Sequence, residues 1–167
     1  MIKQWMALTT AAGLGLMSAW AFAAREELEF YVSVHIPTLQ FYVIPSEPDW
    51  IHREQRLPWD VNTSTLGSLR RHFDVRHDSS AIEARLESFP YLTNGRDPNA
   101  HILLRVFFNG KLLSHDPVPQ QVVTAEEARN GTRVLLEIQP VEQFEGYKPG
   151  DYFGTVNLMF NAAAPQG

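Results

Sequence analysis

The chain has 167 residues, of which 44% are hydrophobic and 20% charged, and its formal net charge is −5. This length is enough for one domain of ordinary size with its own core, and the acidic balance argues against a nucleic-acid partner, because phosphate binding needs clustered Lys and Arg. The absence of cysteine excludes disulfides, cysteine-ligated zinc, iron–sulfur clusters and a thiol nucleophile.

The chain begins with a segment typical of a secretory signal peptide. Lys3 supplies a positive charge, a largely apolar and uncharged run follows, and residues 21–23 have the small-x-small form that signal peptidase accepts. We therefore expect cleavage between Ala23 and Ala24, which removes residues 1–23. The alternative is a membrane anchor, but the apolar run is shorter than the ~20 residues that a spanning helix needs. Losing Lys3 from the 14 basic residues leaves 13 against 19 acidic ones, a net charge of −6.

The clearest alternation in the sequence follows this segment. From Leu28 to Ile36, every second side chain is apolar, which predicts a half-buried strand. Pro37 ends the strand, because proline cannot donate a hydrogen bond to a neighbouring strand. The apolar face consists of Leu28, Phe30, Val32, Val34 and Ile36.

The next part of the chain predicts further strands and one stretch without a regular element. A strand is expected over residues 39–44, closed by Pro45. Residues 50–60 are polar and interrupted by proline, and they predict no regular element. Residues 69–76 alternate loosely, which favours a strand, whereas residues 81–86 suit either a strand or a short helix.

Two Asn-Gly pairs mark turns in the middle of the chain, at Asn94-Gly95 and Asn109-Gly110. Residues 102–108 predict a strand, and the second Asn-Gly pair directly after it is the strongest hairpin signal in the sequence. Both residue types tolerate the positive φ that a type I′ turn requires. A hairpin is therefore expected here.

A short helix is expected between two strands in the last third of the chain. Residues 121–124 predict a short strand, and Thr124 with Glu127 three residues later has the pattern of a capping box. The pair Asn130-Gly131 should end this helix, and residues 132–138 predict the next strand.

The chain closes with a turn over residues 147–151, a final strand over residues 152–160 and an unstructured tail over residues 161–167. Counting this strand, the sequence predicts roughly eight short strands and little helix. That pattern favours an all-β sandwich in a single domain.

The sequence holds little that points to catalysis or metal binding. His72 and His77 lie near Asp74 and Asp78, but on a strand His77 would point away from the other three, so a solvated polar face is favoured over a metal site. No nucleophile elbow, phosphate-binding glycine loop or His-Glu-x-x-His motif is present. We therefore expect no enzyme, no catalytic residue and no metal or cofactor.

Exposed aromatic side chains raise a second functional hypothesis. Trp50, Trp59 and Tyr91 could stack on sugars, which would make the protein a secreted, self-complete β-sandwich that binds carbohydrate. Packing in the core or at a sheet edge is the alternative for these rings and is favoured for most aromatic side chains.

Four blocks of sequence, in order, resemble one known family. They are the strand that ends at Pro37, residues 82–93 with Phe-Pro-Tyr-Leu-Thr, the hairpin over residues 108–114, and residues 150–160 with the pattern Gly-x-Tyr-x-Gly-x-Val-x-Leu-x-Phe. In these blocks the chain resembles the major pilins of coli-surface-antigen-one-type fimbriae, the alpha or class 5 branch of chaperone–usher pili. The absence of cysteine agrees with that branch.

The resemblance implies a fold, a function and a set of partners. It implies an incomplete immunoglobulin-like β-sandwich that lacks its last strand and is completed by a donor strand from a neighbouring subunit. The function implied is that of a structural pilin, exported through the periplasm to a cell-surface fimbrium. The partners implied are identical subunits in a head-to-tail polymer, a periplasmic chaperone, an outer-membrane usher and a tip adhesin.

The resemblance also implies roles for two strands. The donor strand would lie within residues 24–37 and use Leu28, Phe30, Val32, Val34 and Ile36, and the pilin domain would span residues 38–160. Burying five such side chains is worth roughly 7–15 kcal/mol before the strand's ordering is counted. A slip by one residue would present the polar face, so the register is well specified. The acceptor groove, which the chaperone would also bind, would use Tyr152, Gly154, Val156, Leu158 and Phe160.

Overall fold

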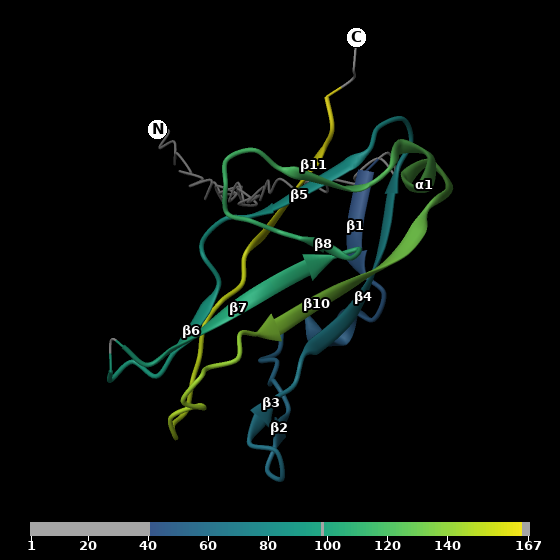
Figure 1. Cartoon of the computed structure of the whole chain (residues 1–167). Helices are drawn as coiled ribbons and strands as arrows, with labels where there is room; N and C mark the ends of the chain where they lie inside the picture. Colours follow the sequence, from purple (N-terminus) through teal and green to yellow (C-terminus); the bar gives the residue numbers. More distant parts are fainter. Residues whose placement is uncertain (1–40, 98, 165–167) are drawn as a thin grey trace, which may run out of the picture. The chain divides into compact units, whose positions relative to one another are not determined.

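The computed structural model describes residues 41–97 and 99–164, which form short strands joined by turns and irregular connections, with little helix (Figure 1). The predicted signal peptide and the predicted strand over residues 28–36 lie outside the described residues. The strands are β1 Phe41–Pro45, β2 Trp59–Asp60, β3 Thr65–Leu66, β4 Leu69–His77, β5 Ile82–Leu86, β6 Tyr91–Thr93, β7 His101–Phe108, β8 Lys111–Leu112, β9 Gln120–Val123, β10 Thr132–Pro140 and β11 Leu158–Ala162; the helices are the 3-10 helix η1 Pro48–Trp50 and the α-helix α1 Ala125–Asn130.

Two antiparallel sheets contribute to one hydrophobic core. The larger sheet has the order β1-β4-β10-β7-β6, with β8 paired to β7, and the smaller sheet has the order β11-β5-β9. The strands β2 and β3 form a separate hairpin. Both sheets supply buried side chains to a single cluster, so the described part of the chain is a β-sandwich.

Alternating burial along the strands explains why these segments are strands. In β5, Ile82, Ala84 and Leu86 are buried while the residues between them are not. This period of two decides the open choice over residues 81–86 in favour of a strand. β4 buries Phe73 and Val75 in the same way. The strand predictions over residues 39–44, 69–76, 102–108, 121–124 and 132–138 are likewise confirmed within the described residues, each to within two residues at its ends.

A row of aromatic rings crosses the core between the sheets. The ring of Phe160 on β11 lies 4.9 Å from that of Phe108 on β7, measured between centroids. Phe108 lies 5.7 Å from Phe73, and Phe73 lies 5.7 Å from Trp50 in η1, both in T-shaped contacts. Such edge-to-face pairs stabilise a core beyond the area that they bury. Trp50 is therefore a partly buried residue that packs against the core.

Local chemistry fixes the predicted turns and the helix. Asn109 and Gly110 have φ of 50° and 73°, as the type I′ hairpin between β7 and β8 requires. In α1, the side chains of Thr124 and Glu127 form the predicted capping box, and Gly131, with φ of 72°, ends the helix. In the described part of the chain, neither helix is long and apolar enough to cross a membrane.

The prediction for the last strand is wrong at both ends. Instead of spanning residues 152–160, β11 begins only at Leu158 and continues to Ala162, so two residues assigned to the unstructured tail are in the strand. The backbone of Phe153 instead exchanges two hydrogen bonds, of 2.9 and 3.0 Å, with Thr93 of β6. The chain thus leaves the larger sheet at Phe153 and joins β5 of the smaller sheet at Leu158, and the crossing cannot be part of either ladder.

The strand order matches that of an immunoglobulin sandwich with one position empty. In that fold, strands A, B, E and D form one sheet and C, F and G the other. Here β1, β4, β10 and β7 take the positions of A, B, E and D, and β5 and β11 take those of C and F. β9 lies on the far edge of β5, and among the described residues no strand takes the position of G beside β11. The fold is an incomplete immunoglobulin-like β-sandwich.

Candidate functional site

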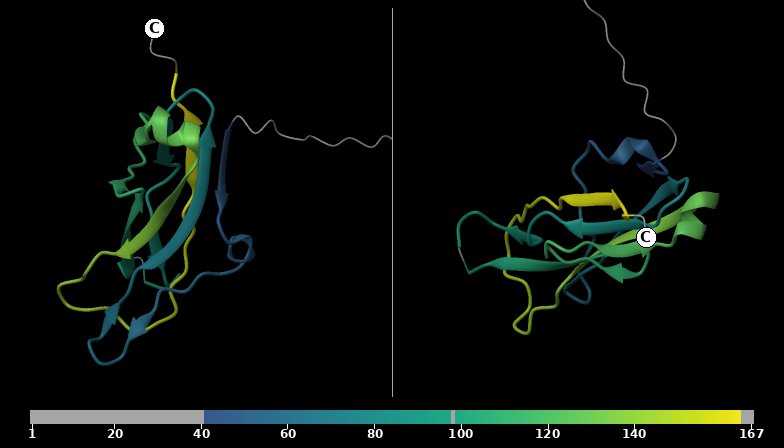
Figure 2. Two further views of the ribbon diagram at one scale, coloured as in Figure 1. Left: turned by 90° about the vertical axis from the view of Figure 1, so that its right-hand side faces the viewer. Right: turned by 90° about the horizontal axis from the view of Figure 1, so that it is seen from above.

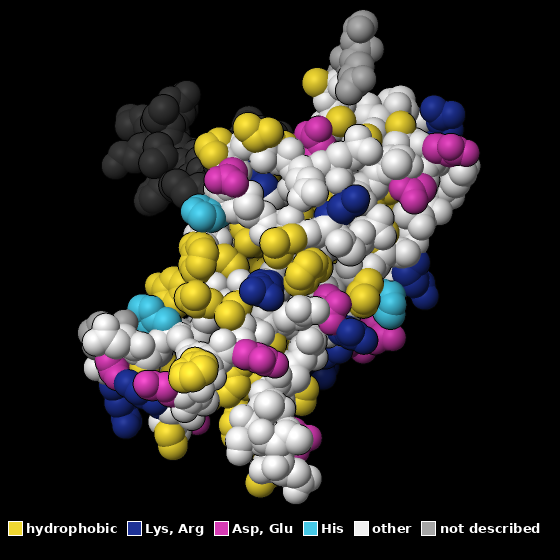
Figure 3. Space-filling view, in the orientation of Figure 1, with side chains coloured by type: hydrophobic (Ala, Val, Ile, Leu, Met, Phe, Trp, Pro, Cys, Tyr) yellow, Lys and Arg dark blue, Asp and Glu magenta, His cyan; other side chains and the backbone are white. Residues whose placement is uncertain are grey.

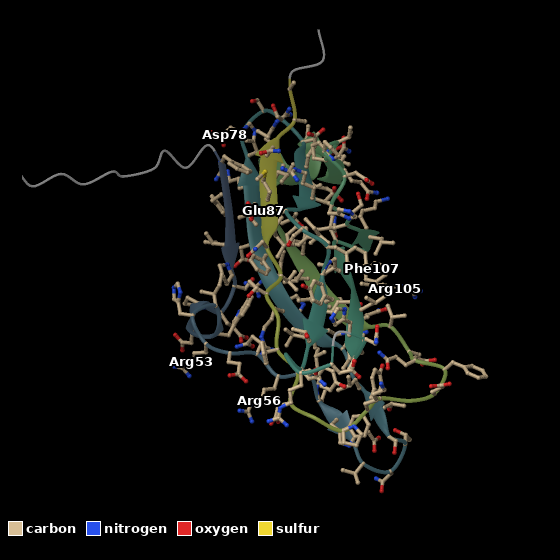
Figure 4. The ribbon with its side chains drawn as sticks, turned by 90° about the vertical axis from the view of Figure 1, so that its left-hand side faces the viewer. Arg53, Arg56, Asp78, Glu87, Arg105 and Phe107 are labelled. Carbon is tan, nitrogen blue, oxygen red and sulfur yellow. The ribbon has the colours of Figure 1, made fainter. Side chains whose placement is uncertain are left out.

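The outermost strands of the two sheets lie on the same side of the sandwich. Figure 4 shows β1 (blue) and β11 (yellow) next to each other, and the view from above in Figure 2 has both strands on one side of the sandwich. Within residues 41–97 and 99–164, β1 pairs with β4 alone and β11 with β5 alone. Each therefore has one edge whose backbone N–H and C=O groups are free to pair with another strand.

The core is incompletely covered along these two edges. Val75 and Val106, on central strands of the larger sheet, are completely buried. The hydrophobic side chains that β1 and the β11 segment turn toward the core are only partly buried, although they pack against the same cluster. We call them the open-edge residues: Phe41, Val43, Val156, Leu158 and Phe160. A strand with apolar side chains at every second position would fit such a site.

The structure brings three of the five predicted acceptor residues to this site, namely Val156, Leu158 and Phe160. The other two lie before the chain joins the smaller sheet. Tyr152 is half-buried, and its hydroxyl donates a 3.1 Å hydrogen bond to the carbonyl oxygen of Lys148. Gly154 lies against β6.

Two open-edge residues were not anticipated from the sequence. Phe41 and Val43 belong to the predicted strand over residues 39–44, and their spacing places them on one face. That alternation is the signal that could have found them. The alternation points to the open edge only once β1 is known to be the outermost strand next to β11. That position follows from the strand order of both sheets, which the sequence does not show.

Gly154 allows the chain to cross closely over β6. A Cβ atom at this position would collide with the carbonyl oxygen of Tyr91 and lie 3.1 Å from Cδ2 of Leu92. A residue without a side chain is therefore required where these two backbones approach each other. The crossing in turn sets where β11 begins.

We expect Gly154→Ala to destabilise the domain by about 1–3 kcal/mol, because the added methyl group must push the crossing away from β6. Urea unfolding followed by tryptophan fluorescence measures the loss. Thr155→Ala is the matched control, since Thr155 is adjacent and exposed, and it should change stability by less than about 0.5 kcal/mol. Equal effects of the two substitutions would contradict the close approach.

Two of the polar groups considered as metal ligands take part in hydrogen bonds of the sheet and of the turn after β4. Arg133 donates hydrogen bonds of 2.7 and 3.1 Å to the carboxylate of Asp74, which lowers the pKa of that carboxyl. Nδ1 of His77 accepts hydrogen bonds from the backbone N–H groups of Ser79 and Ser80. No group of three or more possible metal ligands occurs among the described residues.

The aromatic rings considered for sugar stacking each pack on a different partner. Trp50 contacts Phe73 in the core. Trp59 lies 6.1 Å from Tyr147 in a T-shaped contact, and Tyr91 lies 5.0 Å from His101, measured between ring centroids. Each ring thus has a packing partner, although Trp59 and Tyr91 remain 47% and 43% exposed.

Exposed apolar side chains also occur on the outer face of the larger sheet. Hydrophobic groups gather over β6, β7 and β8 in Figure 3. They include Tyr91, Leu103 and Leu112, which are 43%, 42% and 51% exposed. Because these side chains point away from the core, this face is separate from the open-edge residues.

Comparison with known proteins agrees with this architecture. No curated protein matches the chain. The fold is similar to that of the CooA pilin subunit from enterotoxigenic Escherichia coli, with a TM-score of 0.58 and 16% sequence identity over 75% of this chain and 90% of that one. At this identity the likeness shows the fold alone.

The family comparison extends over most of the chain. The family of CS1 type fimbrial major subunits, which are structural proteins of the cell-surface fimbrium, matches residues 26–161. This range includes the strand predicted before Pro37 and nearly all of β11. The chain therefore belongs to the family of CS1 type fimbrial major subunits.

Proposed function

We propose that this pilin polymerises by donor-strand exchange, in which the strand over residues 28–36 of one copy adds to β11 of the next. The observation that carries the proposal is the open edge: the position of strand G is empty among the described residues, and the core-facing side chains beside it are only partly buried. Backbone hydrogen bonds to β11 would supply affinity, and the alternating apolar side chains would set the register.

The proposed donor fits the site in length and pattern. Residues 28–36 span about 30 Å when extended, at about 3.3 Å per residue. Residues 156–162 span about 23 Å by the same measure, so the donor can cover the open edge from end to end. The five apolar donor side chains would face the open-edge residues, and the polar side chains between them would face solvent.

The same open edge accounts for the other partners that we propose. A subunit with an unpaired edge strand and exposed core would aggregate unless covered, so a periplasmic chaperone would occupy the site first. An outer-membrane usher would then exchange the chaperone for the next subunit's strand, and a tip adhesin would end the polymer. The signal peptide over residues 1–23 would direct export to the periplasm.

Deleting residues 24–36 tests the proposal. We expect the truncated subunit to form no filaments in negative-stain images, because it cannot donate a strand, and yet to accept a synthetic peptide of residues 24–37. A peptide at about 100 times its Kd should raise the Tm by about 10 °C. The same peptide carrying Val32→Asp is the control and should raise it much less.

The alternative function predicts a different outcome. If the protein were a self-complete carbohydrate-binding sandwich, residues 24–36 would be part of its own core. Deletion would then unfold the domain. A free peptide of residues 24–37 would replace the molecule's own missing strand and restore its fold without linking one copy to another. Filaments that form without residues 24–36 would also contradict donor-strand exchange.

A further inference from the structure

The two ends of the sandwich carry different elements. At one end, Phe41 at the start of β1 pairs with His77 at the end of β4. The turn after β4 leads directly to β5, whose first residue Ile82 pairs with Ala162 at the end of β11. The start of β1 and the end of β11 therefore lie at the same end, which we call the upper end; Asp78 marks it in Figure 4.

The opposite end, here called the lower end, carries the loop over residues 141–150, which is the first part of the connection from β10 to β11. β10 reaches this end at Pro140, which pairs with Leu104 near the start of β7. The side-chain amide of Gln143 donates a 2.6 Å hydrogen bond to the carbonyl oxygen of His101. The loop projects beyond the sheets in Figures 1 and 4.

The loop is also held in place after its tip, by an ion pair and an aromatic contact. Nζ of Lys148 lies 3.1 Å from the carboxylate of Asp97, and hydrogen bonds from the backbone of Asn99 and from Lys148 lower the pKa of Asp97, which favours its charged form. On the same loop, the ring of Tyr147 packs on Trp59. These contacts fix the loop to two other elements of the lower end.

Phe144 at the tip of this loop is completely exposed, with a relative accessibility of 107%. A tethered loop that holds a phenylalanine away from its own domain suggests a contact with another molecule, because exposing such a ring is unfavourable. In the proposed polymer that molecule is a neighbouring copy of the chain. The direction of the inserted strand determines which end of the neighbour lies near the lower end that carries Phe144.

The direction of the donor strand decides which end of the donating copy lies near the lower end of the accepting copy. Strand G of an immunoglobulin sandwich runs antiparallel to strand F. β11 runs from the lower to the upper end, so an inserted strand runs from the upper to the lower end and places its Ile36 near the lower end. Five Cα–Cα steps separate Ile36 from Phe41 of the donating copy, and they span at most roughly 18 Å. The upper end of the donating copy is thereby held close to the lower end of the accepting one.

We infer that Phe144 of the accepting copy contacts the upper end of the donating copy, which is the copy whose strand fills the acceptor's open edge. This inference rests on the proposed donor-strand exchange and adds a second contact between successive copies. The surface that receives the ring lies among the upper-end elements, which are the turn after β4, α1 and the end of β11. A donor strand running parallel to β11 would instead start its linker at the upper end of the acceptor and leave Phe144 uncovered.

Photo-crosslinking tests the contact in assembled filaments. We would replace Phe144 with p-benzoylphenylalanine, irradiate the filaments and map the crosslinked peptides by mass spectrometry. We expect a crosslinked dimer whose second peptide comes from residues 76–81, 124–131 or 158–164 of a neighbouring copy. Val118 is the control position, because it is also apolar and 79% exposed but belongs to a different loop, between β8 and β9; it should give no link to these segments.

A disulfide gives a second, independent measurement. The chain has no cysteine, so Phe144→Cys combined with Ser79→Cys introduces a single pair. Oxidised filaments should give a ladder of covalent multimers in denaturing, non-reducing gels, and Val118→Cys with Ser79→Cys should not. Filaments that form normally but crosslink elsewhere or not at all would overturn this inference and leave donor-strand exchange standing, whereas the absence of filaments from the unmodified chain would overturn the proposed function.

Discussion

Replacing Val32 with Asp is expected to abolish filament formation. Val32 is the central member of the five apolar side chains that we propose to enter the open edge. A carboxylate at this position would be buried among apolar groups without a partner, which costs several kcal/mol and cancels much of what the strand gains by binding. Negative-stain images and the ladder of unheated multimers in denaturing gels measure the loss.

Ser33→Asp is the matched control for this substitution. It introduces the same charge one residue away, and because side chains alternate along a strand, residue 33 would face solvent in the assembled polymer. Filaments should therefore form at near-normal length. Equal loss of filaments in both variants would contradict the register proposed for residues 28–36.

Leu158→Asp is expected to block the opposite half of the same interaction. Leu158 is a partly buried, core-facing residue of β11, which pairs with β5 on one edge and with no strand among the described residues on the other, so a carboxylate there would oppose the incoming apolar strand. The variant keeps residues 28–36 and can still donate. Mixing Leu158→Asp with Val32→Asp subunits should therefore yield dimers that do not extend, which size-exclusion chromatography detects.

Met159→Asp is the control on the same strand. Met159 is 36% exposed and alternates with Leu158, so its side chain faces away from the core, and this variant should still polymerise. Near-UV circular dichroism shows whether Leu158→Asp remains folded, and Leu158→Ala, which adds no charge, should shorten filaments without abolishing them. Long polymers from Leu158→Asp alone would exclude β11 as the acceptor.

Much of the fold could be predicted because its signals are local. The hairpin at Asn109-Gly110 follows from two residue types that accept positive φ, and the helix over Ala125–Asn130 follows from the hydrogen bonds of Thr124 and Glu127. Alternation alone predicts the strand over residues 69–76. Each of these features depends on residues that are close together in the sequence.

The features that could not be predicted depend on tertiary arrangement. The hairpin of β2 and β3 has two residues in each strand, too few for a period to appear. The start of β11 is set where the chain, after pairing with Thr93 through Phe153, crosses to the smaller sheet and pairs with Leu86 through Leu158. The alternation through residues 152–160 does not reveal this change of partner. The roles of Phe41 and Val43 at the open edge follow only from the order of the strands.

The position of β1 has a mechanical consequence for the proposed filament. β1 starts at the upper end, whereas the strand that fills the open edge leaves at the lower end, so a pulling force would enter each subunit at one end and leave at the other. The force would act along the strands, and the hydrogen bonds of an antiparallel pair lie perpendicular to them. Such a load shears all the bonds of the inserted strand together instead of peeling them apart one by one. This geometry would let a chain without a single disulfide resist tension.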